Sequence, residues 1–254
     1  MTYHLYITNK NYSSWSLRPW LLMKVLRIPF TEHLEPIIPG SMRQPQWKAF
    51  SPTAHVPCLH DVDGSEGEGE IVLWESLAIV DYLAEMHPGV GIYPGGNGSR
   101  KEREVRAWAR SATAEMHGGF GAIREEMSMN IGLRVELPVS GMSEGLRRDL
   151  ERVNELWEEG LRRFGGPYLA GSRFSVVDAF FAPVVLRLVT FVGSMEVIGD
   201  ERVRRWVELI LGMEEVREWV GDSVRETGRE PVHDEGSLRG CDGGIRRVLE
   251  DLRA

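Results

Sequence analysis

A glycine- and proline-rich stretch at residues 88–99, PGVGIYPGGNGS, divides the chain into two parts with different patterns. It has no apolar periodicity, which is typical of a boundary between domains. Before it, short apolar runs alternate with helical patterns, which predicts an α/β domain. After it, the apolar spacing is helical, which predicts an all-α domain. We therefore expect an α/β plus all-α protein with domains at 1–88 and 100–221, a linker at 89–99 and a tail at 222–254.

The first part has the order strand, helix, strand, then strand, strand, helix. The expected strands are Tyr3–Thr8, Phe30–Pro36, His55–His60 and Glu70–Trp74. Proline is tolerated in the first turn of a helix, where its missing N–H has no partner, so Pro19 places the start of the first helix near 16–18. A second amphipathic helix begins at Glu75. The loop DVDGSEGEGE between the last two strands predicts an antiparallel hairpin.

The second part reads as four helices joined by polar segments. The expected helices are Arg100–Glu126, Ser143–Phe164, Val176–Val192 and Asp200–Val220. Residues 127–141 are expected to be a loop, and a short helical turn is expected at Pro45–Phe50. The charged, glycine-rich tail from Gly221 is expected to be mobile. Its last ten residues, IRRVLEDLRA, are expected either to dock as a short terminal helix or to fray.

Charge and cysteine content exclude several classes of function. The chain has 30 Lys and Arg against 38 Asp and Glu, a formal net charge of −8, which argues against nucleic acid or an anionic membrane bound through bulk charge. Cys58 and Cys241 lie far apart, which argues against a disulfide framework or a structural zinc site. No secretory signal and no run of 18 apolar residues is present. We therefore expect a cytoplasmic protein.

Four motifs occur in a fixed order along the chain. They are SSWSLR at 13–18, HVPCL at 55–59, ESLAIVDYL at 75–83 and SRFSVVDAFFAP at 172–183. Together they resemble the cytosolic glutathione transferases, over about residues 3–220. The first is similar to the SSCS-type run of the zeta class and to bacterial and fungal members with SSWS. The resemblance implies a thioredoxin-like glutathione-binding domain followed by a helical domain that lines a second-substrate pocket.

The serine run is the candidate catalytic element. Glutathione reacts as its thiolate, yet a free thiol with a pKa of about 8.5 is only ~3% ionised at pH 7. A hydroxyl donor and the positive end of a helix stabilise a thiolate. By alignment with the family motif we expect Ser14 to be this donor, with Ser13 and Ser16 as alternatives that also contact glutathione. Tyr12 is a further competitor, and Arg18 adds positive potential. The plain alternative is that the serines only cap the helix.

Two further motifs supply the expected glutathione contacts. Val56–Pro57 resembles the family's cis-proline, which leaves the Val56 backbone free to pair with the cysteinyl part of glutathione; the alternative is an ordinary trans proline. His55 is expected either to meet the glycyl carboxylate or to be a surface histidine. Ser76 and the helix N-terminus suit the γ-glutamyl carboxylate. Glu75 suits the α-ammonium, although both residues also fit a plain helix cap.

The remaining assignments concern the helical domain. Ser175 and Asp178 form a capping box and are expected to be structural. At the place where relatives line the second-substrate pocket stand Trp108, His117, Phe120 and Arg124. A core position is the stronger alternative for the two aromatic residues among these.

The resemblance implies a glutathione transferase with a detoxification role. Glutathione would be its co-substrate, and an electrophilic small molecule would be its second substrate. A zeta-like isomerase of the maleylacetoacetate type and a non-catalytic binding protein of the same fold are the alternatives. The resemblance also implies a homodimer. No metal, nucleic-acid or membrane partner is expected.

Overall fold

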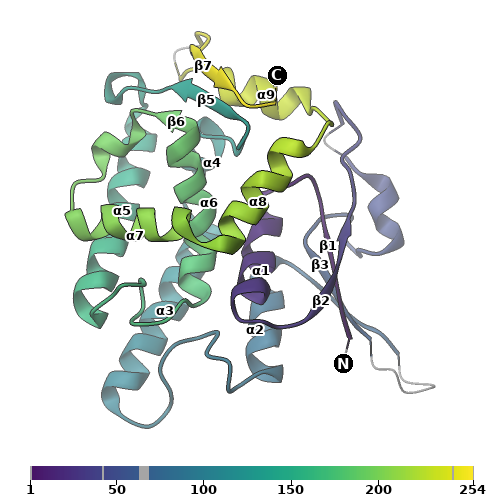
Figure 1. Ribbon diagram of the computed structural model, residues 1–254, viewed down its shortest axis with the longest axis vertical. Helices are drawn as coiled ribbons and strands as arrows, with labels where there is room; N and C mark the ends of the chain where they lie inside the picture. Colours follow the sequence, from purple (N-terminus) through teal and green to yellow (C-terminus); the bar gives the residue numbers. More distant parts are fainter. Residues whose placement is uncertain (1, 42, 63–68, 242, 254) are drawn as a thin grey trace.

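The computed structural model describes residues 2–41, 43–62, 69–241 and 243–253. Its first part is a thioredoxin-like sheet in the order β2-β1-β3-β4 with two helices on one face (Figure 1). The elements are β1 (Thr2–Ile7), α1 (Ser14–Val25), β2 (Phe30–Leu34), the 3₁₀ turn η1 (Pro45–Ala49), β3 (Cys58–Val62), β4 (Ile71–Trp74) and α2 (Ser76–Met86). The middle of the acidic hairpin loop, residues 63–68, lies outside the described residues.

Strand β1 organises this sheet. It pairs in parallel with β2 and antiparallel with β3, so the expected order of elements is confirmed. Tyr3, Leu5 and Ile7 are buried, and the intervening positions are more exposed. Because side chains alternate across a strand, these three residues form the face that the helices cover.

Helix α1 begins earlier than Pro19 suggested. Ser13 is the N-cap and the helix starts at Ser14, so Pro19 lies inside it, past the first turn. The expectation of a start near residues 16–18 was therefore wrong. In this position proline removes one backbone hydrogen bond, to the carbonyl of Trp15. Burial of almost the whole helix, including Trp20 and Leu21, offsets this cost.

The second part is helical, with a small second sheet. Its elements are α3 (Arg100–Gly118), α4 (Gly121–Glu126), β5 (Leu133–Glu136), η2 (Val139–Gly141), α5 (Glu144–Phe164), α6 (Val176–Thr190), β6 (Phe191–Val192), η3 (Ser194–Val197), α7 (Glu201–Gly212), α8 (Glu214–Arg225), α9 (Pro231–Leu238) and β7 (Val248–Asp251). Two expected helices are each broken in two. Phe120 adopts a left-handed conformation with φ 60° between α3 and α4, and Met213 is extended between α7 and α8.

The tail differs most from expectation. Residues 231–238 form α9, and residues 248–251 form a strand where a short terminal helix or a frayed end was expected. Strand β7 pairs antiparallel with β5, which itself lies in the expected loop 127–141, giving the sheet β6-β5-β7. Leu133 and Val135 are buried on alternate positions of β5. The alternation of apolar residues runs through the whole of 127–137, a strand pattern that the loop interpretation missed.

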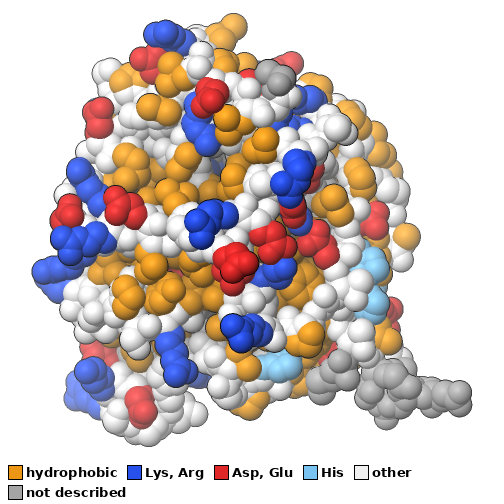
Figure 2. All heavy atoms as spheres, viewed as in Figure 1, with side chains coloured by type: hydrophobic (Ala, Val, Ile, Leu, Met, Phe, Trp, Pro, Cys, Tyr) orange, Lys and Arg blue, Asp and Glu red, His pale blue; other side chains and the backbone are white. Residues whose placement is uncertain are grey.

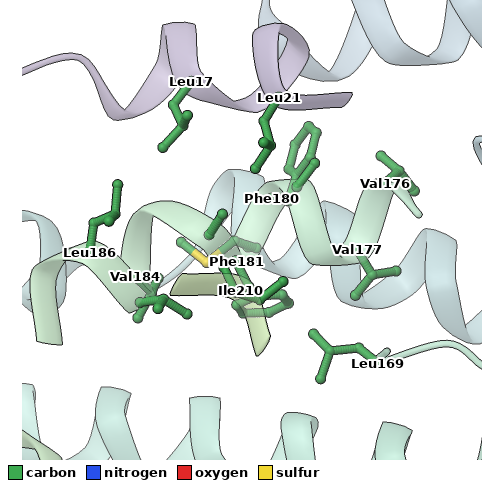
Figure 3. Close-up of a cluster of buried hydrophobic side chains, with 14 of the residues drawn as sticks. Leu17, Leu21, Leu169, Val176, Val177, Phe180, Phe181, Val184, Leu186 and Ile210 are labelled. Atoms are coloured by element: carbon green, nitrogen blue, oxygen red, sulfur yellow. The ribbon is translucent and has the colours of Figure 1, made fainter. Parts of the chain in front are cut away.

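Helix α6 is the centre of the helical core. It is buried on nearly all sides and packs against α1, α3 and α7. Figure 3 shows Leu17 and Leu21 of α1 pointing toward α6, with Leu21 beside Phe180. The capping box is confirmed: Asp178 Oδ2 accepts from the Ser175 backbone N–H at 3.0 Å, and Asp178 Oδ1 from the Trp206 indole at 2.9 Å. These bonds satisfy a fully buried carboxylate.

The surface carries side chains of both charges (Figure 2), as the mixed charge composition predicts. On the face shown in Figure 2, acidic and basic side chains are interspersed with apolar ones. Among the described helices, none combines the length and apolar character that crossing a bilayer requires.

Candidate active site

Two adjoining cavities lie in the sheet domain, the larger one bordered also by the tail, and they share Trp15 and His55. The smaller, of about 240 Å³, is lined by Trp15, Thr53, His55, Val56, Pro57, Glu75 and Ser76. The larger, of about 320 Å³, is lined by Thr8, Tyr12, Ser13, Trp15, Ile37, Ser41, Gln44, Trp47, His55, Glu230 and His233. The two cavities therefore bring together residues of the first three sequence motifs and two residues of the tail.

The smaller cavity has the features of an anion site. The Val56–Pro57 peptide bond is cis, in agreement with the resemblance. Glu75 has φ 70°, a conformation that costs energy for a residue with a side chain and that is concentrated at functional sites. Beside it the Ser76 hydroxyl is buried and has no hydrogen-bond partner among the described residues. Ser76 is the first residue of α2, so its unpaired hydroxyl and the free backbone amides of the first helical turn lie together at the smaller cavity.

The three serines of the SSWS run have different surroundings. Ser13 lines the larger cavity and caps α1, where its Oγ accepts from the Ser16 N–H at 3.2 Å and donates to Ser16 Oγ at 2.8 Å. Ser16 is fully buried. Ser14 is nearly buried, and its Oγ accepts from Arg187 Nη2 of α6 at 3.1 Å. Of the three serines, Ser13 is therefore the one that lines a described cavity.

Tyr12 has a different task. Its hydroxyl donates to Asp234 Oδ1 at 2.9 Å. It also accepts from the Glu230 N–H at 3.2 Å and from Arg253 Nη1 at 2.9 Å. A phenol has one O–H to donate, and in Tyr12 this O–H is hydrogen-bonded to the Asp234 carboxylate. Tyr12 thus ties the tail to the loop before α1 and has no proton left for a thiol.

A group of buried arginines surrounds the start of α1. Arg187 donates to the Ile123 carbonyl and Arg124 to that of Gly119, while Arg18 donates to that of Met116. These carbonyls lie where α3 and α4 end, so cations meet the negative ends of two helices.

Burial lowers the pKa of Arg187 to about 9, and the nearby positive charge of Arg124 adds to this shift. Burial also lowers the pKa of Arg18, with smaller effects from the charges of Arg124 and Arg187. Among the described residues, no carboxylate lies within ion-pair distance of these three guanidinium groups. No neighbouring carboxylate of the described chain therefore neutralises these three groups.

Trp15 separates this charge from the cavities. The Arg18 and Arg124 guanidinium carbons lie 4.3 and 4.5 Å from the centroid of its ring. His117 meets the same ring edge-on at 5.2 Å and approaches Glu75 at 3.9 Å. His117 and Arg124 are thus placed around Trp15, near the interface between the domains.

The two aromatic residues expected in the second-substrate pocket lie in the core instead. Trp108 packs against Phe164, with 5.2 Å between ring centroids, and Phe120 packs edge-on against Phe181 at 6.4 Å. Both belong to the main hydrophobic cluster and line neither of the two cavities. Both residues are therefore core residues, as the alternative interpretation held.

Several residues of the larger cavity were missed from the sequence, among them Trp47, Glu230 and His233. Trp47 is 5% exposed and its indole Nε1 is buried without a hydrogen-bond partner in the described part of the chain. Glu230 and His233 come from the tail. A single aromatic residue in a short turn and a charged tail carry no pattern that separates them from ordinary surface residues.

Cysteine and metal chemistry have little support at this site. Cys58 is buried and donates from its thiol to the Phe50 carbonyl at 3.4 Å, and burial raises its pKa to about 11. A thiol of this kind is unreactive. Within the described ranges, no group of three or more His, Cys, Asp or Glu side chains is arranged to hold a metal ion.

Comparisons with known proteins agree with this geometry. Residues 12–86 match the family model of the glutathione S-transferase N-terminal domain, and residues 133–209 match that of the C-terminal domain. The chain is 28% identical over 190 residues to the glutathione S-transferase-like protein OpS6 of Beauveria bassiana, covering 74% of this chain and 80% of that protein. It is 27% identical over 153 residues to a probable maleylacetoacetate isomerase of Vibrio cholerae, covering 60% and 65%.

Solved structures share the fold. Glutathione transferase Omega 2S of Trametes versicolor matches with a TM-score of 0.60 and 19% identity, over 88% of this chain and 96% of that one. A glutathione transferase homologue from Burkholderia, solved with bound glutathione, matches with a TM-score of 0.55 and 22% identity, over 88% and 98%. With both domains of the family matched in order along the chain, the chain belongs to the glutathione S-transferase family.

Proposed function

We infer that the chain is a glutathione transferase: it binds glutathione and activates its thiol for attack on an electrophilic small molecule. The observation that carries this is the Ser76 hydroxyl, buried and unpaired at the start of α2 beside the cis Pro57. A native structure seldom leaves a buried hydroxyl without a partner, and a ligand carboxylate here would supply one. Family membership and the serine run at the next cavity give this ligand its identity.

The unpaired groups allow glutathione to be placed end to end. The γ-glutamyl carboxylate would accept from Ser76 Oγ and the first amides of α2, with the α-ammonium near Glu75. The cysteinyl backbone would pair with Val56. The glycyl carboxylate would lie at the wall that the two cavities share, where the exposed His55 is a donor.

This placement brings the sulfur toward Ser13, which we propose as the thiolate donor in place of Ser14. Ser13 Oγ would turn its proton from Ser16 Oγ to the sulfur while still accepting from the Ser16 N–H. The N-terminus of α1 and the arginine group behind Trp15 add positive potential. The thiol proton leaves to water, and the sulfur lone pair forms a bond to the electrophilic carbon as the leaving group departs.

Glutathione-dependent cis–trans isomerisation of the zeta type is a second candidate. It is supported by the SSWS run and by the similarity to the Vibrio cholerae maleylacetoacetate isomerase. In that reaction the thiolate adds reversibly, so the same residues act. A purely binding role needs no hydroxyl at the thiol position, and Ser13 is therefore evidence for catalysis.

We also propose that the enzyme is a cytoplasmic homodimer with a detoxification role. Ile71 and Trp74 on the edge strand β4 are 50% and 42% exposed, which supports association through this edge. Light scattering at micromolar concentration should give the mass of two chains; the mass of one chain would refute the dimer without affecting the proposed activity.

The activity itself is tested with glutathione and 1-chloro-2,4-dinitrobenzene. Calorimetry should show glutathione binding, and the rise in dinitrophenyl-thioether absorbance should show conjugation. A Ser76→Ala variant should bind glutathione more weakly. Absence of binding at millimolar glutathione in the intact protein would refute the proposed function.

A further inference from the structure

The tail is bound to the loop that carries the thiol site. Glu226 accepts from the Lys10 N–H at 2.7 Å and from the Asn11 N–H at 3.3 Å. The Tyr12 hydroxyl holds Asp234 and Arg253, as described above. In Figure 1 the yellow C-terminal segment crosses one end of the helical domain, and its strand β7 lies beside β5. The described tail residues 226–241 and 243–253 are thus a fixed wall beside this loop, and they lie beyond the residues that the family models match.

Two side chains of this wall line the larger cavity. Glu230 is 3% exposed, and both its carboxylate oxygens accept from the Gly40 N–H at 3.1 Å. It also accepts from the Val232 N–H at 3.1 Å. Glu230 is therefore used in holding the tail to the loop after β2. No described Lys, Arg or His lies within ion-pair distance of it, so it makes this side of the cavity unfavourable for an anion.

His233 is the polar side chain of the wall that remains unused. Its ring packs against that of Tyr12, with 5.2 Å between centroids. Nδ1 is buried and has no hydrogen-bond partner among the described residues. A half-turn of the imidazole exchanges Nδ1 with Cδ2, so the ring can present a nitrogen to the cavity without moving the backbone.

We propose that His233 contacts the second substrate, and that this substrate is an uncharged, largely apolar electrophile with a carbonyl group, such as an α,β-unsaturated ketone. Trp15, Trp47 and Tyr12 supply the apolar aromatic wall. Burial lowers the pKa of His233 below its usual range, although the carboxylates of Glu230 and Asp234 act in the opposite direction, so the neutral ring with one N–H is favoured. This inference rests on the proposed function.

The reaction with such a substrate balances without a further reagent. The thiolate sulfur bonds to the β-carbon, the C=C electron pair moves toward the carbonyl oxygen, and the enolate takes a proton from water at the α-carbon. An N–H of His233 directed at the carbonyl oxygen stabilises the charge that develops there. His233 therefore contributes more in the transition state than in the ground state.

The test uses 4-phenylbut-3-en-2-one and its para-carboxylate analogue with the full-length protein. Wild type should favour the neutral ketone by at least about tenfold in kcat/KM. His233→Ala should lose about tenfold or more on the ketone, and His233→Gln, which keeps an N–H donor, should retain much of the activity. Val232→Ala, an exposed position on the same helix, is the matched control and should behave as wild type.

Glutathione affinity separates this inference from the proposed function. The His233 variants should bind glutathione with an unchanged Kd, which also shows that they fold. Unchanged kcat/KM for the ketone in both variants, or a loss matched by weaker glutathione binding, would overturn the role of His233. An equal rate with the carboxylate analogue would overturn the substrate class. If wild type conjugates 1-chloro-2,4-dinitrobenzene, neither of these two results contradicts the proposed function.

Discussion

Replacing Ser13 should raise the pKa of the thiol of enzyme-bound glutathione. Ser13 Oγ lines the larger cavity and is oriented by its bond from the Ser16 N–H, so its proton is free to move from Ser16 to the sulfur. A hydrogen bond to a charged group is worth about 1.5–3 kcal/mol. Since one pKa unit is about 1.36 kcal/mol, Ser13→Ala should raise the thiol pKa by about one to two units. Activity at neutral pH should fall by about ten- to a hundredfold.

Ser13 is also the N-cap of α1, and a matched variant separates the two roles. Ser→Ala at an N-cap costs about 1 kcal/mol of stability, whereas Ser→Gly costs only a few tenths. Ser13→Gly therefore keeps most of the cap and removes the hydroxyl. Both variants should show the raised thiol pKa, although Ser13→Gly should be the more stable in urea.

The assay is thiolate absorbance of bound glutathione, titrated against pH. Ser14→Ala is the decisive comparison, because Ser14 Oγ lies against Arg187. It should shift the thiol pKa less than either Ser13 variant. The reasoning would be refuted if the pKa of bound glutathione in Ser13→Gly equalled that in wild type while the pKa in Ser14→Ala was raised. That result would restore Ser14 as the donor.

Three further predictions follow from single residues. Ser76→Ala should weaken glutathione binding by about ten- to a hundredfold in calorimetry, because a carboxylate loses a hydroxyl donor; an unchanged Kd would contradict the placement. Burial raises the pKa of Asp178 from 3.8 to about 6, so the folded state binds this proton more tightly. The free energy of unfolding should then fall by up to about 3 kcal/mol between pH 4 and pH 6 and stay level above, a decline that Asp178→Asn should lack in urea melts at each pH. In Gly160→Ala the new Cβ would lie 2.4 Å from the Leu169 carbonyl oxygen and 2.5 Å from the Trp108 ring. Overpacking of this kind should lower stability by about 1–3 kcal/mol, and an unchanged urea midpoint would contradict it.

Much of the fold is predictable because its elements carry strong local patterns. The alternation of β1, the amphipathic α2 and the Ser175–Asp178 box appear directly in the residues. The breaks at Phe120 and Met213 do carry a local signal, since Gly119 and Gly121 flank the first and Gly212 precedes the second, but the apolar periodicity on both sides concealed it. Strand β7 forms only because β5 offers it an edge, and that edge exists only in the folded protein.

The site shows the same division between local and tertiary information. Val56, Glu75 and Ser76, which the motifs single out, line one cavity, since each is fixed by its neighbours in sequence. The choice between Ser13 and Ser14 depends on Arg187, which is 173 residues from Ser14 along the chain. His233 is likewise brought in by contacts that no spacing in the sequence encodes. Such long-range contacts are what sequence patterns omit.

A crystal structure with bound glutathione tests the central claim most directly. The account predicts the γ-glutamyl carboxylate on Ser76 Oγ, the cysteinyl backbone paired with Val56, and the sulfur within hydrogen-bond distance of Ser13 Oγ, at 3.0–3.5 Å or so. Glutathione bound away from Ser76 and Val56, or with its sulfur against Tyr12 or turned away from the start of α1, would contradict it.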